Sequence, residues 1–111
     1  MRETQLLKGV LDGCVLQIIS KEEIYGYELV QRLKTAGFVN IVGGTVYPLL
    51  QKLEKKEMIS SQMKPSPDGP PRKYFQITEK GEKYLDDFWK EWHDLVSKVS
   101  ELEVNDNGKG D

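Results

Sequence analysis

Residues 43 to 78, GGTVYPLLQKLEKKEMISSQMKPSPDGPPRKYFQIT, decide the fold, because the hydrophobic period changes within this stretch. A helix is predicted after Gly43-Gly44, with Thr45 as its N-cap, because the threonine hydroxyl can accept from a free N–H of the first turn. Pro48 falls within that first turn, where a missing N–H costs little. One face of the predicted helix is apolar at helical spacing: Val46, Leu49, Leu50 and Leu53.

The second half of the stretch predicts a two-stranded ribbon. Residues 59 to 64 alternate in polarity as one strand would, and residues 74 to 77 supply the returning strand. The proline-rich residues 65 to 71 between them can be neither helix nor central strand. A helix with a polar face, joined to such a ribbon, suits a DNA duplex. The helix fits the major groove, and the ribbon can reach the backbone or the neighbouring minor groove.

Polar and basic side chains of this helix and ribbon, with one tyrosine from an earlier helix, are the candidate DNA contacts. They are Tyr27, Thr45, Tyr47, Gln51, Lys52, Lys55, Lys64, Arg72 and Lys73. Arg72 and Lys73 are adjacent at the start of a strand, so we expect one to face the DNA groove and the other to flank it. The hydroxyl of Tyr25 or Tyr27 could meet a phosphate, and a tyrosine anchored in the core is an equal alternative for each. The alternative for the ribbon tip is a solvated loop.

The chain before this stretch predicts two further helices. Residues 5 to 20 carry a wide apolar stripe, and Gly9 and Gly13 lie four apart on another face. The glycines indicate a close helix crossing, room for a ligand, or tolerance of a weak helix. A second helix is predicted from about residue 25 to residue 36, with Gly37 as the left-handed residue that ends it. The apolar residues 38 to 42 could add a small strand beside the ribbon.

Three motifs carry a family resemblance: YGYEL at residues 25 to 29, GGTVYPLLQKLEKKEMI at 43 to 59 and GPPRKYFQITEKG at 69 to 81. In this order and spacing they resemble the PadR family of bacterial transcriptional regulators, over about residues 5 to 103. The resemblance implies a winged-helix fold and repression that a small molecule relieves. One departure is local: Glu57-Met58 stands where the family commonly has glycine before the first wing strand, which affects a helix C-cap.

The C-terminal part predicts one long helix over residues 79 to 103, with Thr78 as its N-cap. Apolar residues recur along it in alternating steps of three and four, as in a heptad seam. They are Leu85, Phe88, Trp92, Leu95, Val99 and Leu102. Such a helix overruns the small domain that the rest of the chain can build, so its distal half would expose apolar side chains unless a second copy covered them. We therefore expect a homodimer through this seam; the alternative is a helix packed on its own domain.

The predicted fold class is α+β and mostly helical. A winged helix-turn-helix DNA-binding domain is expected over residues 1 to 78, the dimerisation helix over 79 to 103, and a disordered tail over 104 to 111. The net charge of −2 divides unevenly along the chain. Residues 1 to 78 hold eleven Lys and Arg against eight Asp and Glu, whereas residues 79 to 111 hold five against ten. The acidity therefore lies away from the expected DNA face.

The resemblance also implies a ligand site. In some PadR-like proteins with a single C-terminal helix, a tryptophan of that helix and its symmetry mate line a cavity at the dimer interface. Trp92 occupies the matching position, with Gly9, Gly13, Val96 and Trp89 as candidate neighbours. Two facing aromatic rings would sandwich a planar hydrophobic effector, such as a drug or a phenolic compound. The alternative for Trp92 is a packed interface residue that binds no ligand.

Several classes of protein are disfavoured. Cys14 and His93 are the single cysteine and histidine, so no metal cluster, internal disulfide or catalytic set is expected, and we predict neither an enzyme nor a cofactor. No apolar run has the length of a membrane span, and the N-terminus lacks a signal-peptide core, which favours the cytoplasm. The main alternative to a DNA-binding repressor is a winged-helix module for protein–protein interaction, without ligand sensing.

Overall fold

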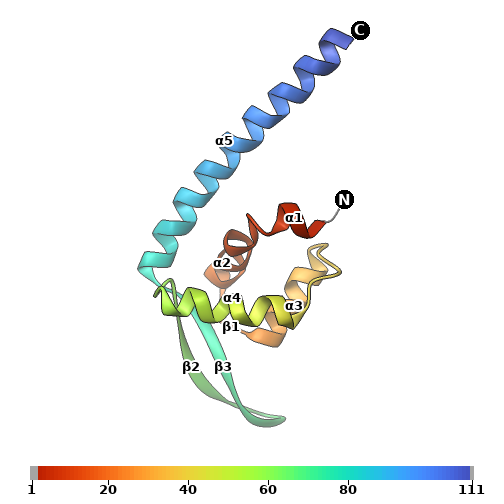
Figure 1. Ribbon diagram of the computed structural model, residues 1–111. Coiled ribbons are helices and arrows are strands. Elements are labelled where there is room, and N and C mark those ends of the chain that lie inside the picture. The colour runs from red at the N-terminus through yellow and green to blue at the C-terminus, as the bar shows by residue number, and fades with distance from the viewer. Residues whose placement is uncertain (1–2, 111) are drawn as a thin grey trace.

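A computed structural model describes residues 3 to 110 of the chain, and the side chains of residues 5 to 104. The fold is mostly helical, with a small antiparallel sheet, and α5 runs away from the remaining elements as a long rod (Figure 1). The described elements are α1 (Glu3–Leu7), α2 (Leu11–Lys21), β1 (Ile24–Tyr25), α3 (Gly26–Thr35), α4 (Gly43–Lys55), β2 (Ile59–Ser66), β3 (Gly69–Ile77) and α5 (Glu79–Gly110). This is the predicted winged helix-turn-helix with a long C-terminal helix.

The N-terminal helix is broken, so the prediction of one helix over residues 5 to 20 is wrong. A turn separates α1 from α2, and in it the amide of Gly9 donates to Leu6 at 3.3 Å and that of Val10 to Leu7 at 2.9 Å. Glycine destabilises a helix interior, which favours a break at Gly9. The turn lets Leu7 and Leu11 both reach the core, where each is at least nine-tenths buried.

The third strand of the sheet comes from a different segment than expected. Residues 38 to 42 form a loop, and the strand beside the wing is β1, whose Ile24 pairs with Phe75 of β3. The strand order is therefore β1-β3-β2. The expected end of α3 is confirmed. Gly37 has a φ of 118°, and the amide of Phe38 donates to the carbonyl of Leu33 at 3.0 Å, which closes the last turn.

Helix α4 starts three residues earlier than predicted. Its first residue is Gly43 and Val42 is the N-cap, so Thr45 lies inside the helix and Pro48 lies in the second turn. Both assignments made from the sequence were wrong, because the extended backbone of Val42 lets the two glycines join the helix. The apolar face is confirmed: Val46, Leu49, Leu50 and Leu53 are buried.

The C-terminus of α4 repeats the ending of α3 with a different residue. The amide of Met58 donates to the carbonyl of Leu53 at 3.0 Å, and Glu57 has a φ of 64°. This left-handed conformation is easy for glycine and costs a residue with a Cβ about 1 kcal/mol. Glu57 thus occupies a position that favours glycine, as the departure from the family pattern at this residue suggested.

The wing strands are longer than the sequence predicted. Strand β2 continues to Ser66 and β3 begins at Gly69, which leaves Pro67 and Asp68 at the tip. Lys64 pairs with Arg72, and a register shift between Lys64 and Ser66 marks an irregularity on β2. The prolines near the start of β3 are tolerated because β1 pairs with β3 only at residues 74 and 75, farther along the strand.

Helix α5 begins as predicted and ends later. The amide of Gly81 donates to the hydroxyl of Thr78 at 3.0 Å, which confirms Thr78 as its cap. Helix α5 continues to Gly110, so residues 104 to 110 are helical rather than the expected disordered tail, and Asp111 lies outside the described residues. None of the described helices is both long enough and apolar enough to cross a membrane.

The proximal and distal halves of α5 have different surroundings. Leu85 is 7% exposed in the core of its own chain, and Phe88 is half-buried against α2. The single chain therefore already covers Leu85 and part of Phe88, and the role predicted for these two residues in a dimer seam stays a prediction. Leu95, Val99 and Leu102 lie beyond the core and are 55%, 55% and 70% exposed, as expected for the distal part of the seam.

Candidate nucleic-acid interface

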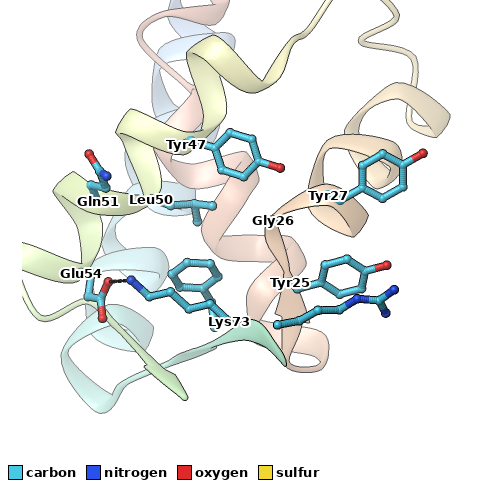
Figure 2. Close-up of a pocket in the computed structure, with 10 residues that line it drawn as sticks. Tyr25, Gly26, Tyr27, Tyr47, Leu50, Gln51, Glu54 and Lys73 are labelled. Carbon is cyan, nitrogen blue, oxygen red and sulfur yellow. Dashed lines mark ion pairs between the residues drawn. The ribbon is translucent and has the colours of Figure 1, made fainter. Parts of the chain in front are cut away.

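A groove of about 310 Å³ lies between α3, α4 and β3, and we call it the tyrosine groove (Figure 2). Its lining residues are Tyr25, Gly26, Tyr27, Tyr47, Leu50, Gln51, Glu54, Arg72, Lys73 and Phe75. Five of the nine predicted DNA contacts are therefore brought together, although they come from three elements. Leu50 and Phe75 are buried and form the floor, whereas Tyr27 and Tyr47 are 60% and 46% exposed at its edge.

Tyr47 is held in a slot made by two glycines. A Cβ on Gly26 would lie 2.3 Å from one edge of the Tyr47 ring, and a Cβ on Gly43 would lie 2.7 Å from the other edge. Gly26 is the first residue of α3 and Gly43 is the first residue of α4. The ring is thus fixed between the starts of two helices, which orients its hydroxyl.

The two adjacent basic residues of β3 are held by different partners. The guanidinium of Arg72 lies 4.4 Å from the centre of the Tyr25 ring, and its Nη2 is 3.6 Å from Asp68. The ammonium of Lys73 pairs with Glu54 of α4 at 3.1 Å, as the dashed line in Figure 2 shows. Both cations lie at the edge of the groove, and surface ion pairs of this kind are weak enough to exchange for phosphate.

Glu54 is the carboxylate of the groove. One of its oxygens accepts from the Ser61 hydroxyl at 2.5 Å, and the other faces Lys73. The hydrogen bond from Ser61, and then the one from Lys73, lower the pKa of the Glu54 carboxyl below its usual value. The carboxylate therefore stays ionised at neutral pH.

The other four predicted DNA contacts lie outside the tyrosine groove. Lys52 pairs with Asp12 of α2 at 3.1 Å, and Thr45 lines a hollow of about 200 Å³ beside α1 and α2. Both lie on the opposite flank of α4 from Tyr47. Lys64 pairs with Glu23, and its ammonium lies 5.6 Å from the Tyr74 ring, so it stands on the outer strand of the wing. Lys55 is exposed on α4.

Two lining residues with polar side chains, Tyr25 and Glu54, were missing from the candidates chosen from the sequence. Tyr25 was considered as a phosphate contact, with a core tyrosine as an equal alternative, and Glu54 was not considered. The spacing of Tyr47, Gln51 and Glu54, in steps of four and three, places them on one helical face and could have identified Glu54. No comparable pattern links Tyr25 to Arg72, because their contact depends on the pairing of β1 with β3.

A second cavity, of about 580 Å³, lies between the N-terminal helices and α5, and we call it the tryptophan cavity. Its lining is almost wholly apolar: Leu6, Leu7, Gly9, Val10, Cys14, Phe38, Phe88, Trp89, Trp92 and Leu95. Three predicted ligand contacts, Gly9, Trp89 and Trp92, are among them.

The remaining two predicted ligand contacts are not among these lining residues. Val96 is 39% exposed on α5. Gly13 is covered by Phe88, because a Cβ there would lie 2.2 Å from the Phe88 ring. Gly13 therefore serves a close crossing of α2 with α5 of the same chain. The two tryptophans also differ, since the indole N–H of Trp89 donates to Gln17 at 2.8 Å. Burial raises the pKa of the Cys14 thiol, which stays neutral beside them.

Comparisons with known proteins agree with this geometry. Residues 15 to 87 match the sequence model described as "Transcriptional regulator PadR-like family". A Streptococcus transcriptional regulator of known structure is 59% identical, with a TM-score of 0.82, over 91% of this chain and 99% of that chain. A PadR-like transcriptional regulator from Bacillus cereus is 46% identical, with a TM-score of 0.81, over 88% and 95%. Bacillus subtilis PadR, solved in complex with operator DNA, is 24% identical over 72% and 46%, with a TM-score of 0.66, and shares the fold.

Proposed function

The chain belongs to the PadR-like family of transcriptional regulators, and from that premise we propose that it is a dimeric repressor which binds operator DNA and is released by a planar hydrophobic molecule. The proposal rests most on one observation. Tyr27, Tyr47, Gln51, Arg72 and Lys73 converge on one groove from a recognition helix, the helix before it and the wing. Because its proposed partner is DNA, we expect the protein in the cytoplasm.

The groove suits a duplex in two ways. The exposed face of α4 carries Gln51 and Lys55, whose side chains can meet base edges and phosphates in a major groove. Arg72 and Lys73 stand where the wing leaves the domain and are suited to the backbone beside that groove. The operator complex of Bacillus subtilis PadR gives a precedent for a duplex on this fold.

Dimerisation is supported by the distal half of α5. Leu95, Val99 and Leu102 expose an apolar stripe that the single chain does not cover. Leu6 of α1 is 77% exposed and lies with Leu95 at the tryptophan cavity, so the apolar surface continues from α5 to α1. A second copy packed on this surface would cover both parts and would present two recognition helices to two half-sites of one operator.

Ligand release is supported by the chemistry of the tryptophan cavity. Trp92 and Trp89 offer flat aromatic faces in an apolar space large enough for a drug-sized molecule. Trp92 is the better candidate for stacking, because Trp89 is fixed by its hydrogen bond to Gln17. A molecule wedged between α5 helices would change the spacing of the two recognition helices, and half-sites about 34 Å apart tolerate little change.

The first test is binding to the promoter of the gene that encodes the protein. A retarded band that weakens with salt is expected for a repressor, since phosphate contacts release counterions. No band at low salt would contradict the proposal and favour a winged-helix module for protein–protein interaction. Release is tested by titrating one planar aromatic compound against free protein and against the operator complex. An inducer must bind the free protein more tightly; equal dissociation constants would rule out that compound.

A further inference from the structure

Glu54 is a carboxylate on the surface expected to meet a polyanion. It lies on the same face of α4 as Tyr47 and Gln51, and its side chain is about one-third exposed at the tyrosine groove. A free carboxylate at this place would repel phosphate and reduce the affinity for any duplex. Glu54 at this position must therefore make a favourable contribution to DNA binding if the repulsion is to be offset.

The contacts of Glu54 divide between its two oxygens. Oε2 accepts from the Ser61 hydroxyl of β2 at 2.5 Å, and Oε1 lies 3.1 Å from the Lys73 ammonium of β3. The first contact ties the recognition helix to the inner part of the wing. The second neutralises the cation nearest to it, so in the free protein Lys73 adds no net charge to the DNA face.

When the protein binds a duplex, Lys73 can keep its ion pair with Glu54 or move to a phosphate. If the lysine stays on Glu54, a phosphate contact is lost. If the lysine moves to a phosphate, Oε1 of Glu54 is left without a donor in an interface that excludes water, which is costly for a charged acceptor. The cost disappears where the DNA itself offers a donor at this place.

We propose that Glu54 is a specificity-determining residue, which accepts a hydrogen bond from a base amino group in the major groove and thereby releases Lys73 to a phosphate. The amino groups exposed there are N4 of cytosine and N6 of adenine. Cytosine suits a carboxylate better, because adenine also presents its N7 acceptor beside N6. Gln51, one turn earlier on the same face, is the neighbouring candidate for base readout. The inference rests on the proposed function, because it requires that α4 enters the major groove.

Because Lys73 leaves Glu54 only when a base amino group replaces it, the phosphate contact of Lys73 depends on the base that Glu54 meets. At a matching base pair, Glu54 gains a donor and Lys73 gains a phosphate. At a mismatched pair, Lys73 stays on Glu54, so both the base contact and the phosphate contact are absent. One residue pair thus weakens non-specific binding more than operator binding.

The test uses full-length protein and two charge-neutralising variants. Wild type first selects its operator from a pool of random duplexes. Dissociation constants for that operator and for a scrambled duplex are then measured over a range of salt concentrations for wild type, Glu54→Gln and Asp68→Asn. Asp68 is the matched control, because it pairs with Arg72 on the same DNA face but lies 80% exposed at the wing tip. A repeat of the selection with Glu54→Gln reports which base position changes.

The expected results separate the two carboxylates. Glu54→Gln should tighten binding to the scrambled duplex, with a salt slope steeper by about one because Lys73 now neutralises a phosphate. The ratio of the two affinities should fall about tenfold, the range of one base contact, and the selected half-site should lose its preference for cytosine at one position, because a glutamine amide pairs with adenine instead. Asp68→Asn should tighten binding to both duplexes by the same factor.

Two results would contradict these expectations in different ways. If Glu54→Gln keeps the wild-type affinity ratio and the wild-type half-site, the inference is overturned while the proposed function stands. If wild type selects no duplex at all, the proposed function fails first and the inference fails with it.

Discussion

The tyrosine groove and the tryptophan cavity use aromatic residues in opposite ways. In the groove, the exposed rings of Tyr27 and Tyr47 are surrounded by an amide, a carboxylate and two cations. In the cavity, Trp89 and Trp92 stand among apolar side chains and a neutral thiol. A polar groove with exchangeable ion pairs suits a charged surface of solvent-exposed phosphates, whereas an apolar cavity suits a molecule that water solvates poorly. A joint between α4 and α5 links the two regions.

That joint is a short chain of hydrogen bonds. The hydroxyl of Thr78 donates to the carbonyl of Glu57 at 2.7 Å and accepts from the amide of Gly81 at 3.0 Å. The amide of Thr78 donates to the carbonyl of Met58 at 3.0 Å. The end of the recognition helix and the start of α5 are thus bonded to each other directly. If the two regions have separate roles, variants in one should spare the chemistry of the other, and variants at the joint should affect both.

The largest effect is expected from charge in the exposed stripe of α5. Leu95→Glu with Val99→Glu should convert a dimer to monomers, because burying two unpaired carboxylates is too costly for the interface to form. Operator affinity should fall with it, since one half-site contact remains. Sedimentation at micromolar concentration measures the assembly. Ser97→Glu with Ser100→Glu, off the stripe on the same helix, should stay dimeric. A wild-type protein that sediments as a monomer would contradict the dimer.

A smaller effect is expected from the wing cations of the groove. Arg72→Ala with Lys73→Ala should weaken operator binding about 100-fold, since two charge-assisted contacts are lost. The salt slope should fall by about two. Lys90→Ala with Lys98→Ala removes the same charge from α5 and should leave both quantities unchanged. Circular dichroism checks that the fold persists. Unchanged affinity and slope in the wing variant would mean that the DNA face lies elsewhere.

In the cavity, Trp92 is expected to contribute more to ligand binding than Trp89. Trp92→Ala should weaken the binding of acridine, used as a planar probe, by about tenfold, because a stacking face is lost. Trp89→Phe keeps an aromatic ring and should have a smaller effect. Calorimetry gives both dissociation constants without relying on tryptophan emission. A Trp92→Ala protein that sediments as a dimer should still bind operator, since Trp92 does not line the tyrosine groove. Equal acridine affinity in wild type and Trp92→Ala would remove Trp92 from the ligand site.

The smallest effect is expected at the joint. Glu57→Gly should raise the free energy of unfolding by about 0.5–1 kcal/mol, because glycine adopts the positive φ without strain, although it also adds freedom to the unfolded chain. Lys56→Gly is the matched control. Lys56 has a φ of −83°, so glycine there should lower the free energy of unfolding by a similar amount. Denaturant titration measures both. Destabilisation by Glu57→Gly would mean that its side chain has a role that outweighs the strain.

Much of the fold could be read from the sequence, because its main elements have their own hydrophobic period. The face of α4, the cap at Thr78 and the seam of α5 were predicted from spacing alone. The errors fell where local preferences compete. Thr45 is a good cap, but the extended backbone of Val42 starts α4 earlier. Gly9 lies in the turn after α1 instead of in a helix, since the turn allows Leu7 and Leu11 to be buried together.

The candidate site was predicted less completely. Its residue types were chosen because arginine, lysine, glutamine and tyrosine are side chains that meet phosphates and bases, and five of the nine chosen residues share the tyrosine groove. Which of them share a surface could not be decided, because Lys52 and Gln51 are neighbours in sequence yet lie on different flanks of α4. Glu54 was missed because the role inferred for it depends on its contacts with Ser61 and Lys73. These two residues come from different strands of the wing and meet Glu54 only in the folded protein.

The sequence by itself determined the helix, the ribbon and the long seam, because helical and strand periods and helix caps depend on residues a few positions apart. Only the tertiary structure decided that β1 rather than residues 38 to 42 joins the wing, that Phe88 fills the space over Gly13, and that Tyr47 lies between Gly26 and Gly43. These outcomes depend on contacts between residues distant in sequence. Several partners can satisfy each such position locally, and the choice among them is made when the whole core packs without voids or clashes.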